Sequence, residues 1–181
     1  MGCGETGAEM ESYLGLQARA LNGQRAVLFR VRTSVADVYL SVSRSNYGNE
    51  ERAVVEVDCA RFLRLWRDDP CGEHAGLANG NPQTWRADPR FELAAEGFSF
   101  GEEDPVPLAE VSCPASAAVP HVAFTDGVMR TLWLAAYAAK SFPVECGVND
   151  AEALQRLAGA AGSLWFSVAE LVPPLVARAR E

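Results

Sequence analysis

Lysine is nearly missing from this sequence: Lys140 is its one lysine, although the chain carries 16 basic and 24 acidic residues and a net charge of −8. Proteins that coat nucleic acids or bind anionic membranes normally need an excess of basic side chains. The composition therefore argues against both classes. It leaves room for a local basic site, because arginine, which supplies almost all of the positive charge, is the better bidentate ligand for phosphate.

Paired cysteines and long apolar runs are also lacking. The five cysteines are an odd number without a Cys-x-x-Cys pair, which favours reduced thiols in a cytoplasm over a secreted disulfide framework. Cys71 and His74 could supply two zinc ligands, but no second tight pair completes a site. No stretch approaches the ~20 apolar residues of a membrane span, and the N-terminus lacks the features of a signal peptide. We therefore expect a cytoplasmic protein with no membrane span.

What is present is the composition of one globular domain: 181 residues, of which 49% are hydrophobic and 22% are charged. Alternating apolar residues predict strands, and apolar residues at every third or fourth position predict helices. We expect one mixed α/β domain over residues 25–181, with a small mixed sheet, flanking helices and C-terminal helices. Residues 1–24 should form a flexible tail and a short helix.

The expected elements follow from these two periodicities. The strands cover 26–32, 37–43, 53–57, 106–111, 119–124 and 142–146. The helices cover 8–21, 58–67, 84–97, 129–137, 149–158 and 163–180, and residues 71–83 form a long loop. Pro89 and Pro173-Pro174 should interrupt their helices, and the proline of 106–111 places that strand at a sheet edge or makes it the start of a strand.

One segment carries residues suited to chemistry, from Thr125 to Arg130, where an expected strand meets the most regular expected helix. The first turn of a helix exposes unpaired N–H groups and the positive end of the helix dipole, so it favours an anion. Thr125 or Asp126 can act as the N-cap, and Gly127 lets the backbone approach a ligand. Arg130 adds a full positive charge with fork geometry. The alternative is structural: Asp126 only caps the helix, and Arg130 pairs with Asp126 or Glu110.

Three segments of the chain share a recognisable order and spacing. They are 57–70 (VDCARFLRLWRDDP), 105–111 (PVPLAEV), and 122–134 (VAFTDGVMRTLWL) with 142–145 (FPVE). The first is similar to a VD-x-x-x-F-x-x-x-W-R-x-D-P helix, and the third to an F-T-x-G-R-H-R-x-x-W-L signature followed by a P-V strand. In these features the sequence resembles the plasmid fertility-inhibition factor family of the ParB/sulfiredoxin-like superfamily, over roughly residues 30–158.

The resemblance implies a compact ParB/sulfiredoxin-like fold in a bacterial cytoplasm. It also implies a protein that blocks transfer of a competing conjugative element or T-DNA through a type IV secretion or coupling system. ATPase and DNase activities, with ATP and Mg²⁺, are attributed to such proteins and centre on the Gly-x-x-Arg segment. Here Val128-Met129 replaces the usual Arg-His, which removes a candidate general base. Val128 also stands where sulfiredoxins carry their catalytic cysteine, so the motif cannot repair sulfinic acids.

Carried onto this sequence, the family's motif matches Gly127 and Arg130, flanked by Thr125 and Asp126. If the protein is an enzyme of this kind, Thr125, Gly127 and Arg130 are expected to bind phosphate. Arg130, Asp126 and Glu110 are then the catalytic residues, and Asp126 and Glu110 hold the metal ion or position water. Glu110 is included because of its position on a strand. The alternative is a non-catalytic inhibitor that docks on a coupling ATPase or a relaxase and keeps a vestigial nucleotide site, since an acidic surface suits a basic partner.

A second basic cluster lies on the first expected hairpin. Arg30, Arg32 and Arg44 accompany Tyr39 and Tyr47, a combination that could follow a DNA backbone. The more ordinary interpretation is a solvated hairpin face. The four tryptophans lie in apolar periodic settings, which favours core packing over base stacking. Nothing in the sequence indicates an oligomeric state.

Overall fold

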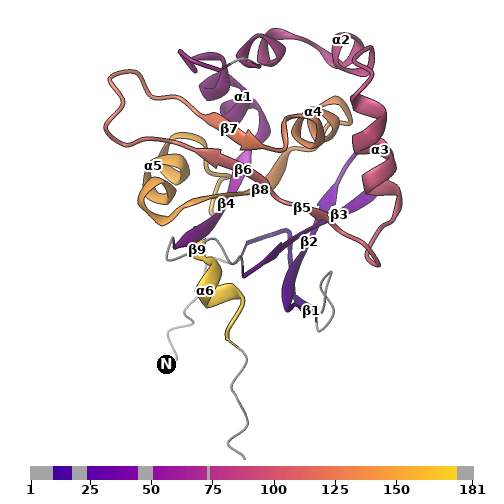
Figure 1. Ribbon diagram of the computed structural model, residues 1–181, viewed down its shortest axis with the longest axis vertical. Coiled ribbons are helices and arrows are strands. Elements are labelled where there is room, and N and C mark those ends of the chain that lie inside the picture. Colours follow the sequence, from indigo (N-terminus) through magenta and orange to yellow (C-terminus); the bar gives the residue numbers. More distant parts are fainter. Residues whose placement is uncertain (1–9, 18–23, 45–50, 73, 175–181) are drawn as a thin grey trace, which may run out of the picture.

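Two β-sheets with helices packed around them make up residues 10–17, 24–44, 51–72 and 74–174, the part of the chain that the computed structural model describes (Figure 1). The smaller sheet has the strand order β1-β2-β3-β5, and the larger has the order β7-β6-β8-β4-β9. The strands are β1 (Tyr13–Gln17), β2 (Ala26–Arg32), β3 (Asp37–Ser43), β4 (Arg52–Asp58), β5 (Val106–Pro107), β6 (Ala109–Ser112), β7 (Ala123–Asp126), β8 (Ser141–Gly147) and β9 (Phe166–Ser167). The helices are α1 (Cys59–Arg67), the 3-10 helix η2 (Ala75–Asn79), α2 (Pro82–Arg86), α3 (Phe91–Ser99), α4 (Val128–Ala136), α5 (Val148–Ala158) and α6 (Val168–Leu171). The expected mixed α/β fold is confirmed, with two sheets in place of one.

The hairpin of β2 and β3 forms where the alternation predicted it. Phe29 of β2 lies opposite Leu40 of β3 in an antiparallel pair, and both side chains are buried in the core. The turn between the strands is closed by Thr33, whose hydroxyl donates to the carbonyl of Ala36 at 2.6 Å. Both expected strands are confirmed to the residue, because one apolar face and one short turn fix their register.

Strands β4 and β8 form the centre of the larger sheet. They pair antiparallel over seven residues each, and Val54, Val55 and Val57 of β4 are fully buried. Helices α1 and α5 pack against β4 and against each other, while α4 lies between β6 and the pair α2 and α3 (Figure 1). All five central residues of β4, from Ala53 to Val57, are buried, and four of them are apolar, which is typical of a strand inside a covered sheet.

The prediction of a helix over 8–21 is wrong for the residues that the structure describes, because 13–17 form the strand β1. This strand pairs antiparallel with β2, with Tyr13 opposite Phe29. Pairing with an already ordered strand outweighs the helix propensity of this segment, which is a weak preference for any single short stretch. The expected end of this helix, at residue 21, lies outside the described residues.

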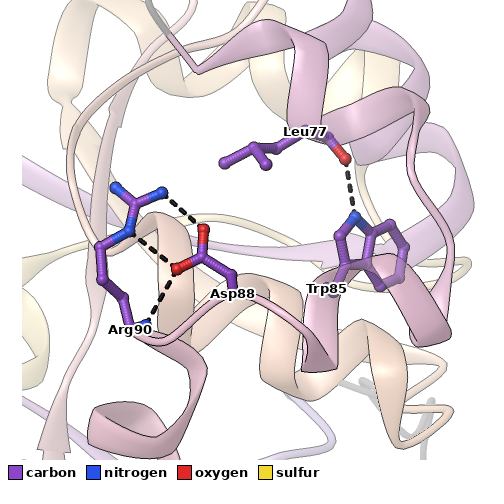
Figure 2. A network of polar contacts seen from close by, with 4 residues as sticks. All are labelled: Leu77, Trp85, Asp88 and Arg90. Atoms are coloured by element: carbon purple, nitrogen blue, oxygen red, sulfur yellow. Dashed lines mark hydrogen bonds and ion pairs between the residues drawn. The ribbon is translucent and has the colours of Figure 1, made fainter.

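The helix expected over 84–97 is two helices, and the loop expected over 71–83 contains η2 and the start of α2. The capping box of Asn81 and Thr84 starts α2. Pro89 then separates α2 from α3, and the Asp88 carboxylate holds Arg90 at 2.7 Å across the break (Figure 2). Trp85 fixes η2 to α2 by donating from Nε1 to the Leu77 carbonyl at 2.7 Å (Figure 2).

Three further boundaries differ from expectation. The strand expected over 106–111 is divided: β5 lies at the edge of the smaller sheet, and β6 lies inside the larger one. The strand expected over 119–124 forms later, as β7. Helix α5 begins one residue before the expected start at 149, with Gly147 as its N-cap, and the Asp150 carboxylate in its first turn accepts a hydrogen bond from the Cys113 amide at 3.0 Å.

The C-terminal helix expected over 163–180 is mostly absent from the described residues. Residues 166–167 form β9, α6 ends at Leu171, and 175–181 lie outside the described part. β9 pairs with β4 through Ser167 and Phe166. The Ser167 side chain then caps α6 together with Glu170, so a strand position and a capping box replace the start of a long helix.

Three of the four tryptophans, Trp66, Trp85 and Trp133, are buried in the core, as the periodicity indicated, and Trp165 is partly buried against it. Trp66 is 1% exposed and meets Phe124 edge to face at 4.7 Å between ring centroids. Trp133 packs against Phe98 and Tyr137, with centroids 4.6 Å apart in each pair. In the described ranges no helix is long and apolar enough to cross a membrane.

Ala138, just after α4, is the one non-glycine residue with positive φ in the described part, at 58°. The Ala139 and Ala138 amides bond back to Leu134 and Ala135, the pattern of a helix end that usually places glycine here. The left-handed conformation costs about 1–2 kcal/mol for alanine, whereas glycine loses about 0.5–1 kcal/mol through backbone entropy. Ala138→Gly should therefore raise the free energy of unfolding by about 0.5–1 kcal/mol in urea denaturation.

Ala135, three residues earlier and inside α4, provides a matched control. Ala135→Gly should lower the free energy of unfolding by about 1 kcal/mol, because glycine is unfavourable inside a helix. Equal destabilisation by both substitutions would contradict the strain assigned to Ala138.

Candidate functional site

The turn between β7 and α4 is built around a glycine in the left-handed conformation. Gly127 is the N-cap of α4, with φ 97° and ψ 17°. The expectation that Thr125 or Asp126 caps the helix is wrong. The Asp126 carboxylate instead accepts a hydrogen bond from the adjacent Gly127 amide at 2.7 Å, and both Asp126 and Thr125 are exposed. A positive φ at this position is the reason the chain needs glycine there.

Position 127 also requires glycine because of the residue that lies beside it. A Cβ atom on Gly127 would come within 2.6 Å of the Ala109 Cβ and 2.7 Å of the Ala109 Cα. Ala109 belongs to β6, which lies between β7 and β8 in the larger sheet. The start of α4 therefore lies directly against the sheet, and no side chain fits between them.

The Arg130 guanidinium makes its contacts with other groups of the same chain. Its Nη2 contacts the Asp126 carboxylate at 2.6 Å, and its Nη1 donates to the carbonyls of Pro107 at 2.6 Å and Leu108 at 3.2 Å. The Arg130 side chain is 16% exposed, compared with 66% for Asp126. The structure thus shows the Arg130–Asp126 pair of the structural alternative. Arg130 joins α4 to β7 and to the point where the chain passes from one sheet to the other.

Three carboxylates lie in a row across neighbouring strands of the larger sheet. Glu110 of β6 is the register partner of Asp126 on β7 and of Glu145 on β8. Glu145 is 8% exposed and is held by the Arg52 guanidinium at 3.2 Å. Burial raises the pKa of Glu145 above its usual value; Arg52 opposes this shift and Glu110 adds to it. The sheet register therefore places Glu110 and Asp126 opposite each other on neighbouring strands, beside an irregularity in the pairing between Glu110 and Val111.

The fit of Mg²⁺ and a phosphate to this turn can be judged from these contacts. Mg²⁺ commonly binds one or two carboxylates and completes its shell with water and substrate phosphates, so Glu110 and Asp126 suit it in number and chemistry. Nowhere in the described ranges do three or more His, Cys, Asp or Glu side chains gather around a common metal position. The Thr125 hydroxyl and the first amides of α4 suit a phosphate. Arg130 could join them only by leaving Asp126.

The three arginines predicted to contact DNA do not form one cluster. Arg30 and Arg32 lie near the turn of the β2–β3 hairpin, where Arg30 is 3.8 Å from the Asp37 carboxylate. Arg44 follows β3 at the opposite end of the hairpin and donates to the carbonyls of Val172 and Ala169. Tyr47 lies outside the described residues. DNA contact by these residues stays a prediction, now confined in space to Arg30 and Arg32.

The sequence analysis did not identify a functional surface on α3, most of which lies within the helix expected over 84–97. Residues 91–104 contain five acidic residues and no basic one, and this absence is the signal that could have singled it out. Leu93 is 67% exposed and Phe100 is 54% exposed, although both are large apolar side chains. We call the following group the acidic α3 surface: Glu92, Leu93, Glu96, Phe100, Glu102, Glu103 and Asp104, all of them exposed.

Gly127→Ala tests the packing of the α4 start. The substitution forces alanine into a left-handed conformation and overlaps Ala109, so we expect a loss of about 2–4 kcal/mol in the free energy of unfolding. Gly101→Ala is the control, because Gly101 also has positive φ (64°) but nothing lies within 4 Å of its Cβ position. That variant should lose only about 1 kcal/mol. Equal losses in urea denaturation would contradict the close contact with β6.

Comparison with known proteins agrees with this architecture. A solved structure with a TM-score of 0.70 and 27% identity is the oncogenic suppression activity protein, described as a plasmid fertility inhibition factor and solved as a gold(I) cyanide derivative; the match covers 92% of this chain and 84% of that one. Protein osa of Shigella flexneri is 34% identical over 91 residues, which are 50% of this chain and 47% of that protein, so the chain matches about half the length of this curated relative. The family model of the plasmid fertility inhibition factor matches residues 54–159, more than half of the sequence. The chain therefore belongs to the plasmid fertility inhibition factor family.

Proposed function

We propose that this protein blocks transfer of a competing conjugative element or T-DNA by docking on a basic protein of the type IV transfer machinery, a coupling ATPase or a relaxase. The observation that carries the proposal is the composition of the acidic α3 surface, in which acidic side chains surround two exposed apolar ones. That the inhibited process is plasmid transfer is inferred from membership of the family. That the partner is basic is inferred from the acidic α3 surface.

The geometry of α3 supports docking through this surface. Leu93, Glu96 and Phe100 follow one another at positions i, i+3 and i+7, so they lie along one face of the helix and its C-cap. The opposite side is anchored in the core by Phe91 and Phe98, which are 2% and 6% exposed. The exposed stripe is therefore presented on a fixed scaffold. A rigid apolar anchor surrounded by charge is typical of a protein-binding surface.

Charge complementarity indicates a basic partner rather than DNA. The whole chain carries a net charge of −8, and residues 91–104 contribute five of its acidic side chains with no basic one. Such a surface repels the phosphate backbone and attracts a basic protein face, and this attraction raises the rate of association.

The proposal predicts that Phe100→Ser abolishes inhibition of transfer. The readout is the frequency with which a co-resident conjugative plasmid moves to recipient cells when the protein is expressed. Leu164→Ser is the matched control, because Leu164 is 52% exposed and Phe100 is 54% exposed. The control should inhibit as strongly as the unchanged protein. Full inhibition by Phe100→Ser at equal expression would contradict docking through this surface.

A second candidate function is hydrolysis of ATP, or cleavage of DNA, with Mg²⁺ at the start of α4. The observation that favours it is the register of Glu110 and Asp126 on neighbouring strands, next to the Gly127 turn. Bound there, Mg²⁺ would supply positive charge for a phosphoryl group. Glu110 and Asp126 would hold the ion, and Thr125 and the first amides of α4 would orient the phosphate. Arg130 would contribute only after exchanging its contact with Asp126 for one with the phosphate.

Glu110→Gln separates the two candidates. The amide keeps the size of the half-buried side chain but removes the negative charge that would hold Mg²⁺. If inhibition depends on hydrolysis, phosphate release from ATP and transfer inhibition should both fall by tenfold or more, as is typical for loss of a metal-positioning group. The docking proposal instead predicts unchanged transfer inhibition, and its loss would contradict docking alone.

The control for Glu110→Gln is Glu152→Gln at an exposed position on α5, which removes the same charge away from both the turn and the acidic α3 surface and should leave ATP turnover and transfer inhibition unchanged. Arg130→Ala is a poorer test, because it also breaks the contacts with Pro107 and Leu108.

A further inference from the structure

A polar pocket of about 410 Å³ lies at the end of α4 that is farther from Gly127. Its walls come from the residues before β1, the end of β2 and its turn (30–34), Glu56 on β4, and the junction between α4 and β8 around Lys140. It therefore shares no residue with the Gly127 turn or with the acidic α3 surface. A volume of this size is within the range of small-molecule sites.

The pocket gathers basic side chains in a chain that is otherwise acidic. Arg32 and Lys140, the one lysine of the sequence, are both exposed, and neither makes an ion pair within the described ranges. Arg30 is paired only loosely, at 3.8 Å from Asp37. The lining thus holds three cations against the carboxylates of Glu11 and Glu56. Its positive side chains are available to an anion.

One wall of the pocket is held in place by a buried carboxylate. Glu56 is 2% exposed and accepts hydrogen bonds from the Ser141 hydroxyl at 2.9 Å and from the Glu11 amide at 3.0 Å. Burial raises the pKa of Glu56, and these hydrogen bonds oppose the shift. The Lys140 carbonyl accepts from the Cys59 amide at 2.9 Å, which fixes the backbone beside the cation. The pocket is therefore largely ordered before a ligand arrives.

Two further features point to a ligand. Ser12 lines the pocket and is 6% exposed, yet its hydroxyl has no hydrogen-bond partner in the described part of the chain. A buried hydroxyl without a partner is costly and needs an explanation. Ala138, also in the lining, holds the left-handed conformation described above, and such strained residues tend to occur at functional sites.

We propose that this pocket binds a small phosphomonoester that carries hydroxyl groups. Arg32 and Lys140 hold the phosphate, and Arg30 adds to the positive field. The hydroxyl of Ser34, which is exposed in the lining, contacts the remainder of the ligand. A bare phosphate ion would leave most of the volume empty, so the ligand is of the size of a sugar phosphate or a nucleoside monophosphate. The proposal does not depend on the docking function.

The test measures the melting temperature of the full chain with ribose 5-phosphate, with AMP and with inorganic phosphate at equal ionic strength. At a tenfold excess over its dissociation constant, a ligand should raise the melting temperature by about 3 °C. We expect this shift with ribose 5-phosphate or AMP and a smaller one with inorganic phosphate. A shift with both esters indicates that the sugar phosphate is recognised, and a shift with AMP alone indicates that the base is also contacted.

Arg32→Ala and Lys140→Ala locate the binding. Each removes an exposed cation, so each should fold normally and lower the affinity about tenfold or more, as expected for loss of a hydrogen bond to a charged group. Arg64→Ala, at an exposed position on α1, is the control and should keep the full shift. The proposal is overturned if neither ester raises the melting temperature, if the shift survives in both pocket variants, or if Arg64→Ala abolishes it equally.

Discussion

The guanidinium of Arg130 joins parts of the protein that are distant in sequence. It contacts Asp126 at the end of β7 and two backbone carbonyls at the passage between β5 and β6, while its own helix starts against β6 at Gly127. One side chain thereby fixes the helix, the edge of the larger sheet and the connection to the smaller sheet relative to one another. The position of α4 determines where α2 and α3 pack, and the acidic α3 surface is presented from that scaffold.

This use of Arg130 bears on the choice between the two proposed functions. A cation whose partners are an aspartate and two carbonyls is not free to bind phosphate, so catalysis at this turn needs an exchange of partners that docking does not need. Glu110 and Asp126 are register partners on neighbouring strands, whereas Glu145 is already paired with Arg52. The contacts at this turn are therefore accounted for by its part in the fold.

The fold could be predicted from the sequence wherever the signal is local. The alternation of β2 and β3 gave both strands, and Asp58 starts α1 by accepting from the Arg61 amide at 2.9 Å, as its position indicated. The strand β1 could not be predicted, because its conformation depends on pairing with β2. For Arg130, the structural alternative predicted a carboxylate partner, Asp126 or Glu110, but not the carbonyls of Pro107 and Leu108. Every residue has a carbonyl, so such a contact leaves no mark in the side-chain pattern.

The division of one short segment between two sheets has a consequence for where the protein can be cut. β5 pairs with β3 in the smaller sheet, and only Leu108 separates it from β6 in the larger sheet. The stretch 54–159 that matches the family includes β5 but begins after β3. A fragment trimmed to that stretch would leave β5 with an open edge and would expose the apolar face that the β2–β3 hairpin covers. The boundaries of family similarity are therefore not boundaries of autonomous folding, and an expression fragment needs the hairpin as well.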